Sequence, residues 1–180
     1  PGQIPWDVIL IIMSAIAAIC ALQLAGGLDY LVRIAENILR KNPKHINYLA
    51  PTVTYFLTLL AGTGHTAFSM IPVIVEVAKS ENIKPSVPLS IAVVASQIAI
   101  TASPVSAAVV AMSGFLEPFG VNYPTLLAIC ISTTFVAVMI TAFVMSTFAN
   151  NDLSSDPVYQ ERLAAGHVAP PREKSADFHL

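Results

Sequence analysis

Two long stretches of this chain contain no Asp, Glu, Lys or Arg, and they constrain its fold more than any other feature. They cover residues 85–116 and 118–151. Each exceeds the roughly 20 residues that a helix needs to cross a bilayer core of about 30 Å. With 55% hydrophobic and 11% charged residues and a mean hydropathy of +0.70, the chain is far more apolar than an ordinary soluble domain. The sequence therefore predicts an all-α membrane protein.

The charges and cysteines exclude several classes of partner. A formal net charge of -2 and a pI near 6.1 leave no basic face for nucleic acid. Cys20 and Cys130 lie inside apolar runs, and no residue near them has the spacing of metal ligands. We therefore expect no nucleic acid, no metal and no resident cofactor, with the lipid bilayer around most of the chain.

The apolar blocks divide the chain into a membrane domain, residues 1–149, and a polar cytoplasmic linker or tail, residues 150–180. The chain opens with PGQIPW rather than Met, which predicts a fragment of a longer protein. Within the membrane domain the pattern predicts a span at 7–25, an amphipathic surface helix at 28–41, a re-entrant hairpin at 46–78, a broken span at 86–113 and a span at 124–148.

The block at 46–78 is too long for one perpendicular span, and it is interrupted in the middle. Its centre is FLTLLAGTGHTAFSMIPV, residues 56–73. The apolar pieces on either side of the AGTGHT stretch are each long enough to reach the middle of a bilayer and no further. Basic residues flank both ends of the block. This charge pattern favours a hairpin with both ends cytoplasmic over the alternative of a kinked span.

A second interruption lies in SQIAITASPVSAAVV, residues 96–110. Ser103 followed by Pro104 predicts a helix start, with the serine as N-cap and the proline at the first helical position. Thr63 and Thr66 are candidate caps of the same kind at the first interruption. Two helix N-termini would then open inside the membrane.

Such interruptions predict a binding site, because non-helical backbone survives inside a bilayer only where it is buried in protein or lines a polar cavity. Helix N-termini present unbonded N–H groups and partial positive charge, which suit a carboxylate. The preceding helix ends, near Ala61 and Ile100, offer carbonyls to a cation or water. Paired broken helices build the midplane sites of many secondary transporters. The predicted substrate-binding residues are Gly62, Thr63, Gly64, His65, Thr66, Thr101, Ala102, Ser103 and Pro104.

Structural roles compete with binding roles for several of these side chains. His65 is either a proton carrier or ligand contact, or a hydrogen-bond donor to a broken-helix carbonyl. Thr101 and Ser103 either contact substrate oxygens or bond within their own helix. Gln97 either bridges helices or lines the cavity, and Glu76 is expected to be solvated.

Three segments give the chain a family resemblance: AGGLDYL at 25–31, AGTG at 61–64 and ITASPVSAAVV at 100–110. Through them, and over nearly its whole length, the chain closely resembles the anaerobic C4-dicarboxylate transporters of bacteria, the Dcu carriers. The resemblance implies exchange or uptake of fumarate, malate, succinate and aspartate by a multi-pass protein of the inner membrane, and no enzymatic activity. It also implies that this chain is about one half of a carrier, that a C-terminal half supplies an inverted repeat, and that the carrier is a homodimer; the coupling ion is open between Na⁺ and H⁺.

Other functions compete with dicarboxylate transport. The same helix ends suit a carrier for another small organic anion. An intramembrane serine protease needs a serine and a histidine inside the bilayer, and Ser69 follows His65 by one helical turn, but no acidic orienting residue accompanies them. An inert structural membrane module is a further alternative. Because no Lys or Arg lies in the predicted core, two helix ends alone do not balance a dianion, and we expect each repeat to hold one carboxylate.

Overall fold

The computed structural model describes residues 6–149 and 152–166, and the regular elements in these ranges are all helical, which confirms the predicted all-α class. One isolated bridge of β type joins Ile83 and Asp152. The elements in chain order are α1 (Trp6–Leu24), α2 (Gly27–Lys41), the 3₁₀ turn η1 (Pro43–His45), α3 (Ile46–Ala61), α4 (His65–Ser80), α5 (Ser86–Ile100), α6 (Ala107–Leu116), η2 (Glu117–Phe119), α7 (Tyr123–Phe148) and α8 (Pro157–Ala164).

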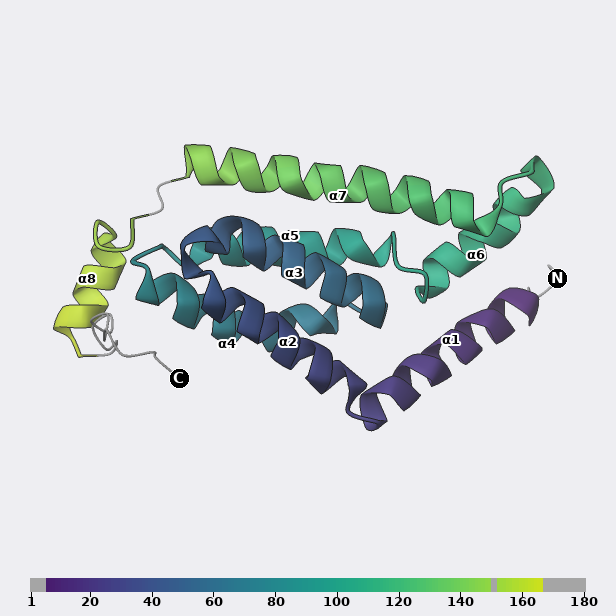
Figure 1. Cartoon of the computed structure of the whole chain (residues 1–180), viewed down its shortest axis with the longest axis horizontal. Coiled ribbons are helices and arrows are strands. Elements are labelled where there is room, and N and C mark those ends of the chain that lie inside the picture. The colour runs from purple at the N-terminus through teal and green to yellow at the C-terminus, as the bar shows by residue number, and fades with distance from the viewer. Residues whose placement is uncertain (1–5, 150–151, 167–180) are drawn as a thin grey trace, which may run out of the picture.

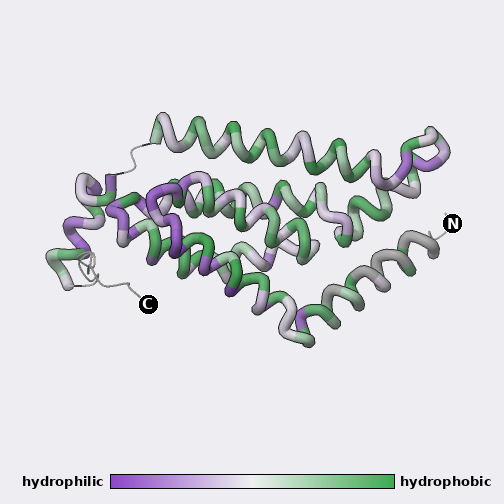
Figure 2. Tube along the Cα trace, viewed as in Figure 1, coloured by the Kyte–Doolittle hydropathy of each residue, from purple (hydrophilic) through white to green (hydrophobic). Residues whose placement is uncertain are grey.

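The helices form an elongated bundle with α3 and α5 at its centre (Figure 1). Helix α7 packs along one side of these two, and α2 and α4 pack along the other. Helix α1 diverges from α2 and approaches α6 at one end of the bundle, whereas α8 lies at the opposite end (Figure 1). Apolar residues run along nearly all of α7, while hydrophilic residues gather at the turns and in α8 (Figure 2).

One apolar helix is long enough to cross a bilayer core, whereas several others are shorter than its thickness. Helix α7, with 26 residues, is the one helix in the described part of the chain that is long and apolar enough to cross a membrane alone. The end of α1 and α2, bent by 70° at Leu24–Gly27, would add a second if the pair forms one span. With 16 residues in α3 and 15 in α5, each extends about 22–24 Å at 1.5 Å per residue, short of a hydrocarbon core of about 30 Å.

Small residues let α5 approach its neighbours closely. Ala95, Ala99 and Ala102 are fully buried and pack with Tyr55 of α3 and Val138 of α7. The Tyr55 hydroxyl reaches α7, where it lies 2.7 Å from Thr134 Oγ1. Helices that pack without a strong hydrophobic driving force rely on such close contact and on hydrogen bonds between helices. The broken helix α5 is therefore fixed between the hairpin and α7.

Helices α3 and α4 form a helical hairpin whose tip is the three-residue turn at 62–64. Helix α3 ends because Gly62 adopts φ +67° and donates its N–H to the Thr58 carbonyl at 2.8 Å, a left-handed C-cap that suits glycine. Helix α4 then begins at His65. The observed end of α3 at Ala61 coincides with the end predicted from the sequence.

The second break is longer than the sequence predicts, because the next helix begins at Ala107 and not at Pro104. Helix α5 ends at Ile100 in tight turns, where the N–H groups of Ala102 and Ser103 bond to carbonyls three residues back, at 3.1 and 3.3 Å. The predicted capping role of Ser103 is wrong, because its hydroxyl is used elsewhere and Ser106 occupies the N-cap position. Proline also disfavours a helical conformation in the residue before it, so the chain turns before it restarts.

Part of the predicted linker or tail at 150–180 is helical. Within residues 152–166 the chain forms helix α8 and contacts the turn between α4 and α5. Asn82 donates its side-chain amide to Asp152 at 2.9 Å, and its carbonyl accepts the N–H of the buried Leu153 at 3.1 Å. Lys84 and Asp156 form an ion pair at 2.5 Å. Residues 167–180 of the predicted tail lie outside the described residues, as do residues 1–5 of the predicted membrane domain.

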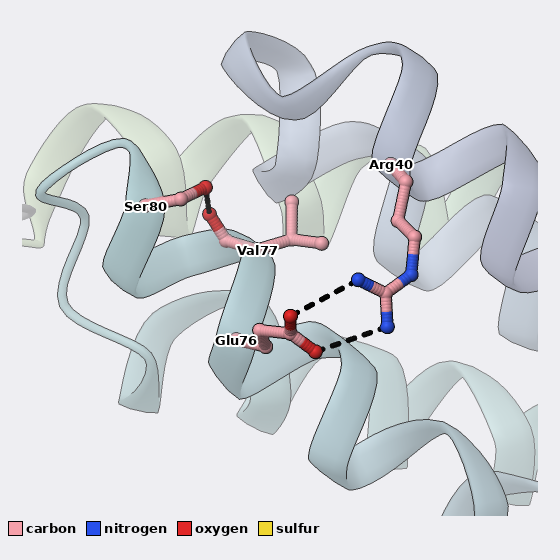
Figure 3. A network of polar contacts seen from close by, with 4 residues as sticks. All are labelled: Arg40, Glu76, Val77 and Ser80. Carbon is pink, nitrogen blue, oxygen red and sulfur yellow. Dashed lines mark hydrogen bonds and ion pairs between the residues drawn. The ribbon is translucent and has the colours of Figure 1, made fainter. Parts of the chain in front are cut away.

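An ion pair joins the amphipathic helix α2 to the returning arm of the hairpin (Figure 3). Both terminal nitrogens of Arg40 donate to the two carboxylate oxygens of Glu76, each at 3.0 Å. Glu76 is solvated as expected, with 55% of its side chain exposed, but it also forms this ion pair. Exposed pairs of this kind contribute at most about 1 kcal/mol, so packing rather than this pair holds α2 against α4.

Candidate functional site

A hollow of about 330 Å³ opens at the tip of the hairpin, between the start of α4 and the end of α5. Backbone and side chains of the tip form one wall, and α5 forms the other. The hollow is lined by Gly62, Thr63, Gly64, His65, Phe68, Gln97 and Ile100. No charged carboxylate, Lys or Arg is among these residues. The hollow therefore lies at the N-terminal end of a helix, with His65 as the titratable side chain in its lining.

Several backbone N–H groups at the hairpin tip have no hydrogen-bond acceptor within the described ranges. The N–H groups of Thr63, Gly64 and Thr66 have no acceptor there, and the N–H of His65 has only the Thr63 hydroxyl, at 3.4 Å. The carbonyls at the end of α3 are better satisfied, since Thr58 accepts from Gly62 at 2.8 Å. A helix start with free N–H groups behaves like about half a positive charge. The tip is therefore suited to an anion rather than to a cation.

Buried hydroxyl groups lock the tip against α5. Thr58 Oγ1 lies 2.7 Å from Thr66 Oγ1 and 2.9 Å from Ser96 Oγ, and all three residues are fully buried. Thr66 also donates to the Thr63 carbonyl at 3.1 Å, and Ser96 to the Gly64 carbonyl at 3.4 Å. Each arm of the hairpin and α5 thus contribute one hydroxyl to a single cluster. These hydrogen bonds hold the backbone of the hairpin tip in position beside the hollow.

Ser103 connects the two helix breaks. Its hydroxyl donates to the Leu59 carbonyl at 2.7 Å and accepts the N–H of Val105 at 3.3 Å. Ser103 is fully buried. The last carbonyls of a helix have no partner within the helix. Ser103 therefore caps the end of α3, not the start of α6, and holds the second break beside the first.

The structure brings only part of the predicted site together. Gly62, Thr63, Gly64 and His65 line the hollow. Thr66, Ala102 and Ser103 are buried beneath or beside it and serve packing and hydrogen bonding. Thr101 and Pro104 are exposed outside the lining: the Thr101 hydroxyl donates to the Ile98 carbonyl at 2.7 Å, and the Pro104 carbonyl accepts from Tyr123 at 2.5 Å.

Several other residues of this region are not predicted from the sequence. Phe68 and Ile100 line the hollow, and Thr58 and Ser96 hold its tip. The sequence contains a signal for the pair, because Thr58 and Ser96 are hydroxyl residues one turn from the two interruptions. Nothing in the sequence indicates that they meet. Gln97 lines the hollow, which decides between the two roles considered for it.

A second hollow, of about 570 Å³, runs along the outer face of α7. Ser132 and Thr133 line it, but their hydroxyls donate to the carbonyls of Ala128 and Ile129 within the same helix, at 2.6 and 2.7 Å. It thus offers no free donor comparable to the tip. Within the described ranges no three His, Cys, Asp or Glu side chains gather in a group that fits a metal ion, and no hydrogen bond joins His65 to Ser69.

Comparison with known proteins gives a consistent result. A family described as "Anaerobic c4-dicarboxylate membrane transporter" matches residues 1–179. The chain is 74% identical to a C4-dicarboxylate transporter DcuA of Wolinella succinogenes over 168 residues, which are 93% of this chain and 39% of that protein. It is 70% identical to the DcuA of Helicobacter pylori J99, over 97% of this chain and 39% of that protein. It is 54% identical to the DcuA of Escherichia coli K12, over 99% of this chain and 41% of that protein.

The chain therefore spans about two fifths of the length of these curated relatives. No solved structure matches it.

Proposed function

Because the chain belongs to the family of anaerobic C4-dicarboxylate membrane transporters, we propose that it forms part of a carrier that exchanges or takes up C4-dicarboxylates such as fumarate, succinate, malate and aspartate across the bacterial inner membrane. The relatives are named as transporters of this substrate class and not as enzymes. The observation that supports a transport site in this chain is the hollow at the hairpin tip, where backbone N–H groups have no acceptor in the described residues.

The partial positive charge at the hairpin tip suits one carboxylate. The start of α4 supplies about half a positive charge, and no Lys or Arg lines the hollow. A dicarboxylate carries about two negative charges, so this tip alone leaves most of its charge unbalanced. We place the second carboxylate against the C-terminal half of the same carrier, with Na⁺ or H⁺ as the coupling ion and a homodimer as the assembly.

The half-length of α3 and α4 supports a re-entrant placement of the hairpin. Each arm has 16 residues and reaches about as far as the bilayer middle. Lys44 and Ser80, near the outer ends of the two arms, then face the same side of the membrane. Single cysteines at these exposed positions should react with an impermeant maleimide from the same side only. Reaction from opposite sides would replace the hairpin with a kinked span.

The transport activity is tested by counterflow in proteoliposomes that contain the full-length carrier with this sequence. Vesicles loaded with unlabelled fumarate should accumulate labelled succinate, with and without gradients of Na⁺ and pH to identify the coupling ion. A monocarboxylate such as acetate, loaded at the same concentration, should not support accumulation. Equal accumulation with acetate would favour a carrier for another organic anion, and none with fumarate would refute the proposal.

A further inference from the structure

We propose that the side-chain amide of Gln97 is the side-chain contact for the carboxylate at the hairpin tip, and that it sets the preference between plain and amino-substituted dicarboxylates. The inference rests on the proposed function, because it concerns the same hollow. It adds a specific residue from the facing helix, α5, to a tip that otherwise offers backbone donors.

Gln97 lies directly across the hollow from the tip backbone. A Cβ atom placed on Gly64 would lie 2.7 Å from Gln97 Nε2 and 3.4 Å from Gln97 Cδ. A separation under 3.0 Å does not occur for real Cβ atoms, so any residue other than glycine at 64 would displace the amide. Gly64 has an ordinary helical φ of -70°, so its backbone does not require glycine. A side chain at 64 would therefore have to move the Gln97 amide and would also crowd Ile100 Cδ1, 3.2 Å from the added Cβ.

The Gln97 amide is available for a ligand. Its donor and its acceptor make no hydrogen bond within residues 6–149 and 152–166, and the residue is exposed to the hollow. The neighbouring N–H groups of Thr63 and Gly64 also lack acceptors in those ranges, and the N–H of His65 has only a long bond to the Thr63 hydroxyl, at 3.4 Å. A carboxylate that takes these N–H groups would lie beside Gln97 Nε2, which donates to an anion without adding charge.

The acceptor end of the same amide gives a basis for selectivity. Aspartate carries an ammonium group next to one carboxylate, whereas succinate carries none. Gln97 Oε1 is a neutral acceptor within the same side chain, and no carboxylate lines the hollow. Replacing the amide by a carboxylate of the same shape removes the donor and adds a negative charge. That change disfavours every dicarboxylate, but it disfavours one with an adjacent ammonium group least.

The test compares succinate and L-aspartate uptake by the full-length carrier in proteoliposomes. Gln97→Leu should raise the KM for succinate by about 10-fold or more, the effect of losing a hydrogen bond to a charged group. Gln97→Glu should raise the KM for succinate further and should shift the aspartate-to-succinate ratio of kcat/KM upward by about 10-fold. The matched control, Gln23→Glu at an exposed position of α1, should leave both values unchanged.

A double-substitution cycle tests the geometry independently. Gly64→Ala alone should raise the KM for succinate about as much as Gln97→Ala, because it displaces the amide. In the Gln97→Ala background, Gly64→Ala should add less than about twofold. Additive effects, or an unchanged KM and substrate ratio in every Gln97 variant, would overturn the inference while wild-type counterflow still supported the proposed function. Loss of counterflow by the wild type would instead refute the function itself.

Discussion

Removing the Ser103 hydroxyl is expected to loosen the hairpin tip. Ser103 is fully buried, and its hydroxyl donates to the Leu59 carbonyl at 2.7 Å. Ser103→Ala leaves that carbonyl at the end of α3 without a donor. An unsatisfied buried acceptor costs about 1–3 kcal/mol, while hydrogen bonds between membrane helices average nearer 0.6 kcal/mol with a maximum of about 1.7. We therefore expect a loss of about 1–2 kcal/mol in the free energy of local opening.

Hydrogen–deuterium exchange of the full-length carrier measures this loss directly. A loss of 1–2 kcal/mol corresponds to roughly 5- to 30-fold faster exchange of the protected N–H groups around the tip, such as that of Gly62. The matched control is Ser113→Ala in α6, because its hydroxyl donates at 2.7 Å to the carbonyl of Val110 within the same helix. The reasoning is refuted if the tip exchanges equally fast in the two variants.

Three further predictions concern the hydroxyl cluster and the two ion pairs. Thr58→Val keeps the side-chain shape but removes the hydroxyl shared by both arms and α5; we expect the carrier to lose about 1–3 kcal/mol in stability, seen as a lower melting temperature, and an unchanged temperature would contradict the cluster. Arg40→Lys removes the two-point contact with Glu76, yet both side chains are about half exposed. The loss of stability should therefore stay below about 1 kcal/mol, and the melting temperature should change little. The Lys84 ammonium lowers the pKa of Asp156 from its usual range; the contact therefore stabilises α8 docking at neutral pH and is lost as pH falls through the lowered pKa. Relative to the intrinsic rate at each pH, exchange in α8 should rise on acidification in the wild type, and at pH 7 it should already be faster in Asp156→Asn.

The positions where helices stop are predictable from the sequence because they depend on local chemistry. Gly62 can adopt a left-handed conformation that other residues avoid, and this ends α3 where expected. Ser103 and Pro104 likewise mark the second break, although a proline alone does not decide it, since Pro51 and Pro72 lie inside α3 and α4. The exact restart of α6 is not predictable in this way, because it depends on Ser103 bonding to Leu59, which is distant in sequence. A serine before a proline has the same local pattern whether it caps the helix that follows or one that ended earlier.

For the site, too, the sequence predicts what depends on neighbouring residues but not the contacts between residues far apart in the chain. The sequence singles out residues 62–65 because polar and glycine residues interrupt an apolar block. It does not show that the facing wall is Gln97 and Ile100 rather than the second break. The docking of residues 152–166 also depends on a distant contact, between Asn82 and Asp152. Composition alone makes that segment resemble a free tail.

The direct test of the central claim is whether backbone N–H groups at the start of α4 bind a carboxylate. His65 is exposed and begins α4, a position where proline is tolerated and removes one N–H. His65→Ala and His65→Pro both lose the imidazole, but only the proline variant loses the N–H, whose one partner in the described residues is the Thr63 hydroxyl at a long 3.4 Å. Gly64 precedes this position and lacks the Cβ that would clash with the proline ring, although its helical conformation, φ -70° and ψ -9°, still brings its N–H near that ring.

The measurement is the succinate Kd of the purified full-length carrier by calorimetry, compared between these two variants. The account predicts that His65→Pro binds succinate about 10-fold more weakly than His65→Ala, the effect of one lost hydrogen bond to a charged group. An equal Kd in the two variants, with both proteins folded by size-exclusion chromatography, would contradict it.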